Sequence, residues 1–285
     1  MYRNNPYQNR LYPQQQRSGG CLRIGIALAV AAFAIISFLG SKTYNPVTGQ
    51  DQYVSISQEQ EIALGIQAAP EMEAQFGGLE PDQDYQTIVQ YVGKYIIDNS
   101  EATQSGYPFE FHVLADQKTV NAFALPGGQI YITRALIDKF ETEGQIAGVL
   151  SHEIMHVLAR HSAEQIAQSQ LAEGLTGALV LATYDPNDPS SMRTAQVAML
   201  ISQLVQMKFS RDDEIAADTF GVDLMSQSSY DPTRMISVMK ILEGASSGAP
   251  IEFFSTHPSP ENRIGRIQAA ITEKYPNGVP TEMIQ

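Results

Sequence analysis

The N-terminal part of the chain contains one long apolar run. Residues 22–39 are interrupted by a single charged residue, Arg23. This length just meets the roughly 17–20 residues that a helix needs to cross a bilayer. A buried helix of the same length would normally be broken by polar positions. The pattern therefore predicts a transmembrane anchor over residues 22–40 and disfavours a core helix.

Apolar and polar positions in the rest of the chain alternate with the periods of helices and short strands. Helical spacing or capping residues occur at 57–76, 84–97, 134–140, 142–162, 192–209 and 211–227. Strand-like patterns occur at 109–114, 120–125 and 129–133. Helices, then a small sheet, then more helices predict an α+β fold.

The same pattern sets the expected domain boundaries. Residues 41–56 contain turn-forming pairs and are expected to be a linker. One domain is expected over residues 57–275, followed by a short tail over residues 276–285. Residues 163–200 are rich in Ala, Leu and Met. They fit a lid over a cleft, a bilayer-facing helix or plain core, and we favour core.

Charge adds an orientation to the predicted anchor. Residues 1–41 carry four arginines and no acidic residue, which leaves the body with a net charge of −17. By the positive-inside rule, a disordered tail over residues 1–21 is expected in the cytoplasm, with the body across the inner membrane. The apolar run is not followed by the small-x-small pair of a cleavage site, so we expect an uncleaved, single-pass anchor.

Composition excludes two classes of protein. The whole chain of 285 residues has a formal net charge of −13, and this argues against nucleic acid as a partner. A single cysteine excludes an intramolecular disulfide and a cysteine-rich zinc ribbon. With five histidines in the chain, any cluster among them is informative.

One such cluster is the sequence His-Glu-Ile-Met-His at residues 152–156. Because residues four apart leave a helix on nearly the same face, His152 and His156 can bind one divalent metal ion. Glu153 would lie beside that metal without having to ligate it, placed to take a proton from water. A buried charged trio in an apolar helix is costly unless a metal compensates it.

A catalytic zinc site needs a third protein ligand and one open position. A third histidine of the longer HExxHxxGxxH motif is absent, because Ser162 stands at that position. Glu214 and Asp218 share one face of a predicted helix, so Glu214 could ligate zinc and Asp218 could orient a ligating histidine. The alternative is a solvated acidic helix start.

Residues 121–128 predict an extended segment that ends at a turn. Near a zinc helix, such a segment can serve as an edge strand to which a substrate peptide adds through main-chain hydrogen bonds. The alternative is an ordinary hairpin turn. The candidate substrate-binding residues are Asn121, Ala122, Phe123, Ala124, Gly127 and Gly128.

Four motifs resemble those of the gluzincin metallopeptidases, which include the CAAX prenyl endopeptidase, the HtpX protease and the periplasmic β-barrel assembly-enhancing protease. The motifs are NAFALPGG, HEIMH, SRDDEIAAD and THPSPENRI, and the resemblance runs over about residues 45–275. It implies a compact zincin-like domain with one Zn²⁺ per chain at His152, His156 and Glu214. It also implies Glu153 as the general base.

The last of these motifs adds two candidate residues. The resemblance suggests that His257 and Arg263 lie near the cleft, where they could stabilise the oxyanion. His257 could instead occupy the open zinc position and hold the enzyme latent. The alternatives are a surface histidine and an arginine on a helix surface. His161 is not expected to reach the metal of His156 from the same helical face, and a structural hydrogen bond is favoured for it.

The expected function is a membrane-anchored zinc metalloendopeptidase that hydrolyses peptide bonds of extracytoplasmic proteins. Its expected partners are unfolded or extended polypeptides and the membrane, and the resemblance suggests a role in protein quality control. One alternative is a chaperone-like envelope assembly factor with a structural or latent zinc site. Another is a metal-dependent hydrolase of non-peptide amides, which a peptide-binding edge strand would disfavour.

Overall fold

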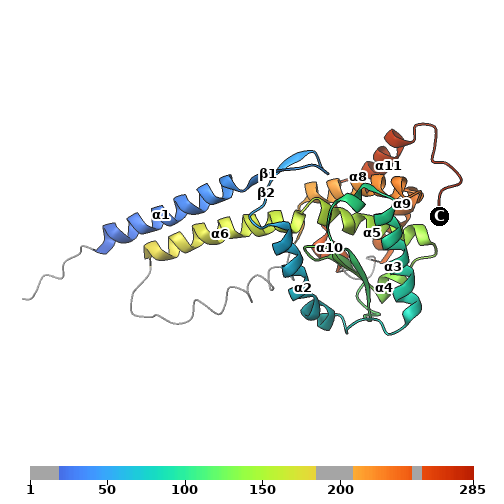
Figure 1. Ribbon diagram of the computed structural model, residues 1–285, viewed down its shortest axis with the longest axis horizontal. Helices are drawn as coiled ribbons and strands as arrows, with labels where there is room; N and C mark the ends of the chain where they lie inside the picture. Colours follow the sequence, from blue (N-terminus) through green and yellow to red (C-terminus); the bar gives the residue numbers. More distant parts are fainter. Residues whose placement is uncertain (1–18, 184–207, 246–251) are drawn as a thin grey trace, which may run out of the picture.

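The computed structural model describes residues 19–183, 208–245 and 252–285. Its body is mostly helical with two small sheets, and a pair of long helices projects from one side (Figure 1). The predicted α+β fold is confirmed. Most of the predicted N-terminal tail and nearly all of the predicted helix over 192–209 lie outside the described residues.

Most of the described helices and strands match the predicted ranges. The main helices are α1 (Gly19–Gly40), α2 (Gln58–Gln75), α3 (Gln83–Asp98), α5 (Glu143–Leu158), α6 (His161–Thr183), α8 (Arg211–Gln227), α9 (Thr233–Ala245) and α11 (Arg263–Lys274). Shorter helical turns are η1 (Glu101–Gln104), α4 (Arg134–Ile137) and α10 (Phe253–Thr256). The strands are β1 (Lys42–Asn45), β2 (Gln50–Tyr53), β3 (Glu110–Leu114), β4 (Ala122–Ala124) and β5 (Gln129–Thr133).

The core is built around α5. This helix packs against α3, α8, α9 and two strands of the larger sheet, so it is buried along nearly its whole length. The sheet has the order β3-β5-β4, in which β3 runs parallel to β5 and β4 runs antiparallel to it. β4 is therefore an edge strand, as the predicted substrate segment requires.

The segment predicted as a linker instead contains the β1–β2 hairpin. Gly49 adopts a positive φ of 69° at its turn, a conformation that glycine adopts at little cost. The side-chain amide of the buried Asn45 donates to Leu158 O at 3.0 Å, which ties the hairpin to the end of α5. Pattern alone did not predict this pairing, because the anchoring contact comes from a residue far along the chain.

Helix α6 only partly follows the core interpretation of residues 163–200. Its first turns pack in the core, where Ala163, Ile166 and Ala167 are buried. It then leaves the body and runs alongside α1 (Figure 1). The two helices approach closely, since a Cβ on Gly174 would lie 2.6 Å from the Cβ of Ala34. The remainder of this range lies outside the described residues.

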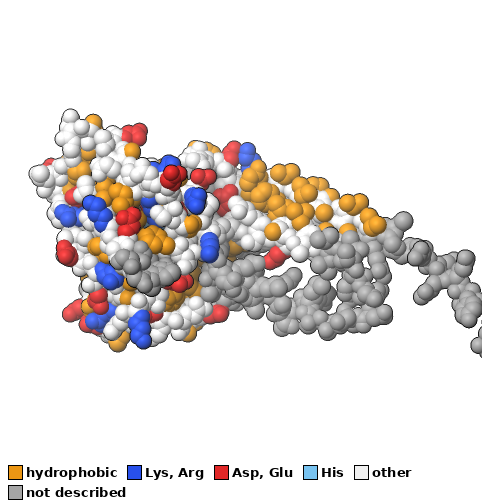
Figure 2. Space-filling view, turned by 180° about the vertical axis from the view of Figure 1, so that it is seen from behind, with side chains coloured by type: hydrophobic (Ala, Val, Ile, Leu, Met, Phe, Trp, Pro, Cys, Tyr) orange, Lys and Arg blue, Asp and Glu red, His pale blue; other side chains and the backbone are white. Residues whose placement is uncertain are grey.

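Helix α1 coincides with the predicted anchor. Within the described parts of the chain, no helix combines the length and apolarity needed to cross a membrane. Hydrophobic side chains nevertheless gather along the projecting helices (Figure 2). The large exposed ones on α1 are Leu22, Ile24, Ile26, Leu28, Phe33, Ile35, Ile36 and Leu39.

Candidate metal centre

Helix α5 carries both histidines of the His-Glu-x-x-His motif. A capping box at Thr142 and Gln145 begins the helix, and the predicted start is therefore confirmed. His152 and His156 are one turn apart and both buried. Their Nε2 atoms lie 3.1 Å from each other, so the two rings point at one common location.

Helix α8 brings two carboxylates to this location. Ser210 caps its N-terminus, and Glu214 and Asp218 follow on one face. Gly221 continues that face, and a Cβ there would lie 3.6 Å from the backbone nitrogen of His152. Helix α8 packs against α5 and carries Glu214 into the interior, where it is fully buried. The solvated-helix alternative is therefore wrong for these residues.

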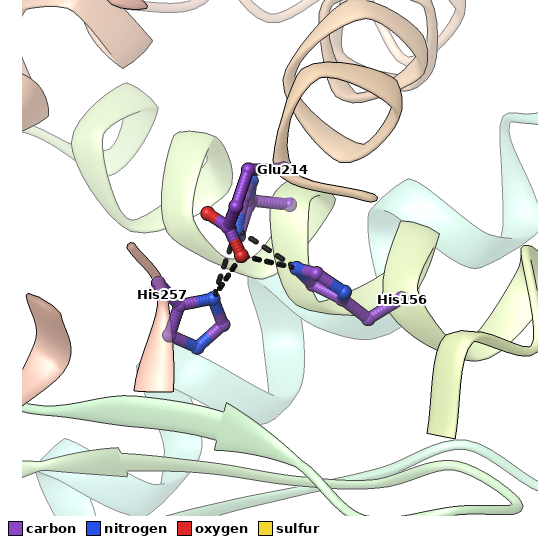
Figure 3. Close-up of side chains that lie close together, drawn as sticks. His156, Glu214 and His257 are labelled. Carbon is purple, nitrogen blue, oxygen red and sulfur yellow. Dashed lines mark hydrogen bonds and ion pairs between the residues drawn. The ribbon is translucent and has the colours of Figure 1, made fainter. Parts of the chain in front are cut away.

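Four side-chain atoms converge between these helices and the segment after α10. They are His152 Nε2, His156 Nε2, a Glu214 carboxylate oxygen and His257 Nδ1, all within 4.8 Å of one another. His257 Nδ1 lies 3.0 Å from Glu214 Oε1 and 3.4 Å from His152 Nε2. His156 Nε2 lies 3.5 Å from the same Glu214 oxygen. Figure 3 shows His156, Glu214 and His257 pointing toward one another.

This spacing fits a tetrahedral zinc ion. Ligand atoms about 2.0–2.1 Å from a tetrahedral metal lie about 3.3 Å from each other. Four of the six separations among these atoms, 3.0 to 3.5 Å, scatter around that value. Histidine nitrogens with one carboxylate are also a donor set that zinc prefers. The residues present therefore fit the metal that the motif predicts.

His257 supplies the fourth of these atoms and is fully buried, so it is not the surface residue of the alternative interpretation. Its ring stacks on Phe253, with 4.5 Å between ring centroids and an interplanar angle of 15°. Its backbone nitrogen donates to Phe253 O at 2.8 Å. Both contacts hold the ring next to His152 and Glu214.

Glu153 is fully buried, and neither of its carboxylate oxygens has a hydrogen-bond partner among the described residues. His257 Nε2, itself unpartnered, lies 3.6 Å from Glu153 Oε1. Burial raises the pKa of Glu153, while His257 and His152 act in the opposite direction. A buried carboxylate is costly, so its position next to the converging histidines indicates a functional role.

Asp218 contacts the outer ring nitrogen of His152, and Arg263 contacts Asp218. Asp218 Oδ1 lies 3.0 Å from His152 Nδ1, the ring nitrogen that faces away from the centre. This is the orienting contact that the sequence predicts for Asp218. Arg263 binds Asp218 and lies 3.2 Å from Glu214 Oε2, and it is buried rather than on a helix surface. Its oxyanion role stays a prediction.

The two motif histidines have opposite pKa shifts. Burial lowers the pKa of His152, but hydrogen bonds to Asp218 and Glu214 outweigh it and raise the pKa to about 9. Burial lowers the pKa of His156 well below its usual range, and the charge of His152 adds to the effect. A metal ion bound here would replace the proton on His152.

Strand β4 borders a small cavity beside the centre. This cavity of about 100 Å³ is lined on one side by Asn121, Phe123 and Ala124, and on another by His257. Asn121 Oδ1 is buried and has no hydrogen-bond partner within the described ranges of the chain. Gly127 and Gly128 have φ angles of 82° and 108°, and a Cβ on Gly127 would overlap the backbone of Ile62. Gly127 therefore permits a close approach of this turn to the backbone of α2.

Two residues at the site were not predicted to contact the ligands. Phe209 stacks on His156, with 3.8 Å between ring centroids. His161 Nδ1 lies 2.9 Å from His156 Nδ1, so the hydrogen bond favoured for His161 goes to a metal-ligand candidate. In one continuous helix, positions 156 and 161 would lie on different faces, so this contact was not expected. Helix α5 instead ends before Arg160, whose φ of 57° changes the direction of the chain.

Comparisons with known proteins agree with this centre. Residues 83–271 match peptidase family M48. The chain is 31% identical over 234 residues to the mitochondrial metalloendopeptidase OMA1 of Schizosaccharomyces pombe, covering 81% of this chain and 66% of that protein. It is 28% identical over 253 residues to the β-barrel assembly-enhancing protease of Escherichia coli, covering 84% of this chain and 50% of that protein.

The match to the OMA1 protein of Saccharomyces cerevisiae, 26% over 235 residues, covers 77% of this chain and 66% of the relative. The chain thus spans between half and just under two thirds of the length of these relatives. The family resemblance drawn from the four motifs is confirmed, and the matched range contains all four converging residues. The chain therefore belongs to peptidase family M48, and its matched domain is that of a zinc-dependent metalloendopeptidase of the HExxH type.

Proposed function

We propose that the whole protein is a zinc metalloendopeptidase that cleaves extended segments of unfolded or unassembled proteins. The observation that carries this proposal is the fully buried carboxylate of Glu153, 3.6 Å from His257 Nε2 and next to the four converging atoms. A zinc site that serves structure alone has no use for this additional carboxylate, because burying it costs stability.

His152, His156 and Glu214 would hold the metal. When bound, zinc supplies a Lewis acid that polarises the peptide carbonyl and acidifies water. Glu153 takes the proton from the attacking water and passes it to the leaving amine, and its raised pKa suits this two-way transfer. Asp218 holds His152 in the tautomer with Nε2 free, and Arg263 holds Asp218.

Substrate would bind along β4. The strand lies at the edge of its sheet and borders the cavity that His257 also lines. A peptide added there by main-chain hydrogen bonds would be held in extended form, which supports unfolded polypeptides over small amides as substrates. The residues assigned to this role are Asn121, Ala122, Phe123, Ala124, Gly127 and Gly128.

His257 would keep this enzyme latent in the conformation described. With zinc bound, its Nδ1 would be a fourth protein ligand at the position that a catalytic zinc site leaves to water. Activation then requires His257 to leave that position. An oxyanion role for His257 would need the same displacement first. The ring stack on Phe253 sets the contacts that must break.

The closed geometry also favours a second candidate, a chaperone-like envelope assembly factor with a structural zinc site. Four protein ligands are typical of structural zinc. One relative is called a β-barrel assembly-enhancing protease, and its name joins assembly to proteolysis. The two candidates differ in whether Glu153 matters for function.

We further propose that α1 associates the protein with a membrane. The large exposed apolar side chains of α1 support this, because water-soluble surfaces rarely carry so many together. The expected orientation, with the arginine-rich tail in the cytoplasm and the acidic body outside, follows from the charge asymmetry of the sequence. Flotation of the full chain with phospholipid vesicles tests association, and a chain that stays in the dense fraction would contradict it.

The function itself is tested by cleavage of unfolded casein by the zinc-loaded full chain, beside Glu153→Gln and His257→Ala. The proposal expects cleavage by the parent or by His257→Ala, and none by Glu153→Gln at equal zinc content. Equal cleavage by Glu153→Gln would expose a contaminant and remove the assignment of Glu153. No cleavage by any of the three, all zinc-loaded, would support the assembly factor.

A further inference from the structure

We propose that His161 is a positioning residue for the metal ligand His156. In this proposal His161 Nδ1 accepts the hydrogen bond that keeps His156 Nε2 free for zinc. The inference rests on the zinc centre proposed above. It concerns the first residue of α6, which lies outside the HExxH motif and has no atom among the four that converge.

The geometry determines which ring nitrogens of His156 and His161 donate and which accept. His156 Nε2 faces the centre, so its Nδ1 must carry the proton if Nε2 is to offer a lone pair to a metal. That Nδ1 lies 2.9 Å from His161 Nδ1, a normal hydrogen-bond length. Two nitrogens at this distance need one donor and one acceptor. His161 therefore accepts at Nδ1 and carries its own proton on Nε2.

The surroundings of His161 favour that tautomer. Its Nε2 lies 3.8 Å from Asp213 Oδ1, so the proton-bearing side of the ring faces a carboxylate. Asp213 is held in place by the N-cap of α8, where its Oδ2 accepts from Ser210 N at 2.8 Å. Both side chains line a cavity of about 790 Å³ that includes neither His152 nor His257. His161 thus separates the metal centre from a second, acidic cavity.

His161 is placed next to His156 by contacts between Arg160 and residues about 100 positions earlier in the chain. Arg160 adopts a left-handed conformation with a φ of 57°, which ends α5 and starts α6 in a new direction. A left-handed arginine is uncommon and must be held by its surroundings. Arg160 Nε donates to the buried Glu61 at 2.7 Å, and Arg160 Nη2 donates to Ile56 O at 2.9 Å. These contacts turn His161 back toward His156.

The two ligand histidines therefore have different supports. His152 is backed by the Asp218 carboxylate, whereas His156 is backed by an imidazole. A contact of this kind raises the basicity of the ligand and fixes its ring orientation. Loss of such a contact typically lowers metal affinity 10- to 100-fold.

The test compares two variants of the full chain, His161→Phe and His161→Asn. Phenylalanine keeps a ring against Phe209 but removes the acceptor, whereas asparagine keeps an oxygen near the Nδ1 position. The zinc dissociation constant is measured by chelator competition, and histidine ¹⁵N spectra report the proton on His156 Nδ1. We expect His161→Phe to bind zinc about 10- to 100-fold more weakly. We expect His161→Asn to stay close to the parent.

His112→Phe serves as the matched control, because His112 lies on β3 and bonds to Gln129 away from the centre. Parent-like zinc affinity for a folded His161→Phe would overturn the inference. Equal weakening by His161→Asn and His161→Phe would also overturn it, since packing would then explain the effect. If His161→Phe does not fold, loss of the His156 Nδ1 proton signal in folded His161→Asn would overturn it. A parent that binds no zinc would overturn the proposed function itself.

Discussion

Arg263 binds both carboxylate oxygens of the buried Asp218, through Nε at 2.7 Å and Nη2 at 2.8 Å. Bidentate pairs of this kind are the strong form of the arginine–carboxylate interaction. The same guanidinium lies 3.2 Å from Glu214, so one arginine interacts with the carboxylates of both Asp218 and Glu214. Without a metal, this arginine is the main permanent positive charge at a centre that also contains Glu153.

The first prediction follows from that charge balance. Arg263→Ala should destabilise the metal-free protein by about 3–5 kcal/mol, because it leaves two buried carboxylates without their cation. Zinc should restore part of this loss, since its charge acts on the same groups. Denaturant unfolding with and without zinc measures both values. Arg263→Lys is the comparison, since lysine cannot bind Asp218 in the same bidentate way. Equal losses with and without zinc would contradict the prediction.

Zinc affinity should rise with pH between about 7 and 9. His152 has a pKa raised to about 9 in the metal-free protein, and it must lose its proton to bind a metal. One proton released per zinc gives about a tenfold gain in affinity per pH unit in that window. Buffer-dependent heats of binding count the protons released. An affinity that is constant from pH 7 to 9 would contradict a raised pKa for His152.

In the metal-free protein, the contribution of His152 to the free energy of unfolding should fall as the pH rises. A histidine whose pKa is raised by folding stabilises the folded state below its unfolded pKa of about 6.5. That contribution is lost as the pH rises through the folded pKa of about 9. Denaturant unfolding in the presence of a metal chelator measures this contribution, and Asp218→Asn is the comparison. The parent should lose more stability between pH 7 and 9 than the variant, which lacks the carboxylate at His152.

Gly65→Ala and Gly127→Ala should each lower stability by roughly 3 kcal/mol, because added methyl groups would overlap backbone. A Cβ on Gly65 would overlap the carbonyl of Pro126, and one on Gly127 would overlap Ile62. Gly177→Ala, at a helical position of α6 with nothing within 4 Å, is the control and should be neutral or slightly stabilising. Thermal unfolding ranks the three. If the first two match the control, the packing of α2 on the β4–β5 turn is not as described.

The centre was largely predictable because its chemistry is local. The i, i+4 spacing places His152 with His156, and Glu214 with Asp218, on single helix faces whatever the rest of the fold does. The packing of α8 against α5, which brings the two pairs together, has no such signature in one sequence. Arg263 could be named but not assigned, since its partners lie on α8.

The less predictable features depend on contacts between distant parts of the chain. Periodicity carries one helix through position 162, but the Arg160–Glu61 contact ends α5 and redirects the chain at Arg160. The β1–β2 hairpin likewise depends on the Asn45 contact to Leu158. In both cases tertiary contacts override the local pattern, and both involve residues at the end of the metal-binding helix.

The proposed latency of the centre can be tested by removing the His257 ring. His257→Ala removes the fourth of the converging atoms and leaves His152, His156 and Glu214, the number that a catalytic zinc site needs. Cleavage of unfolded casein should therefore increase, while zinc binds more weakly because one ligand is lost. Adding Glu153→Gln to this variant should abolish the gained activity, which excludes a contaminating protease. If His257→Ala binds zinc but cleaves more slowly than the parent, His257 assists the reaction instead of blocking it.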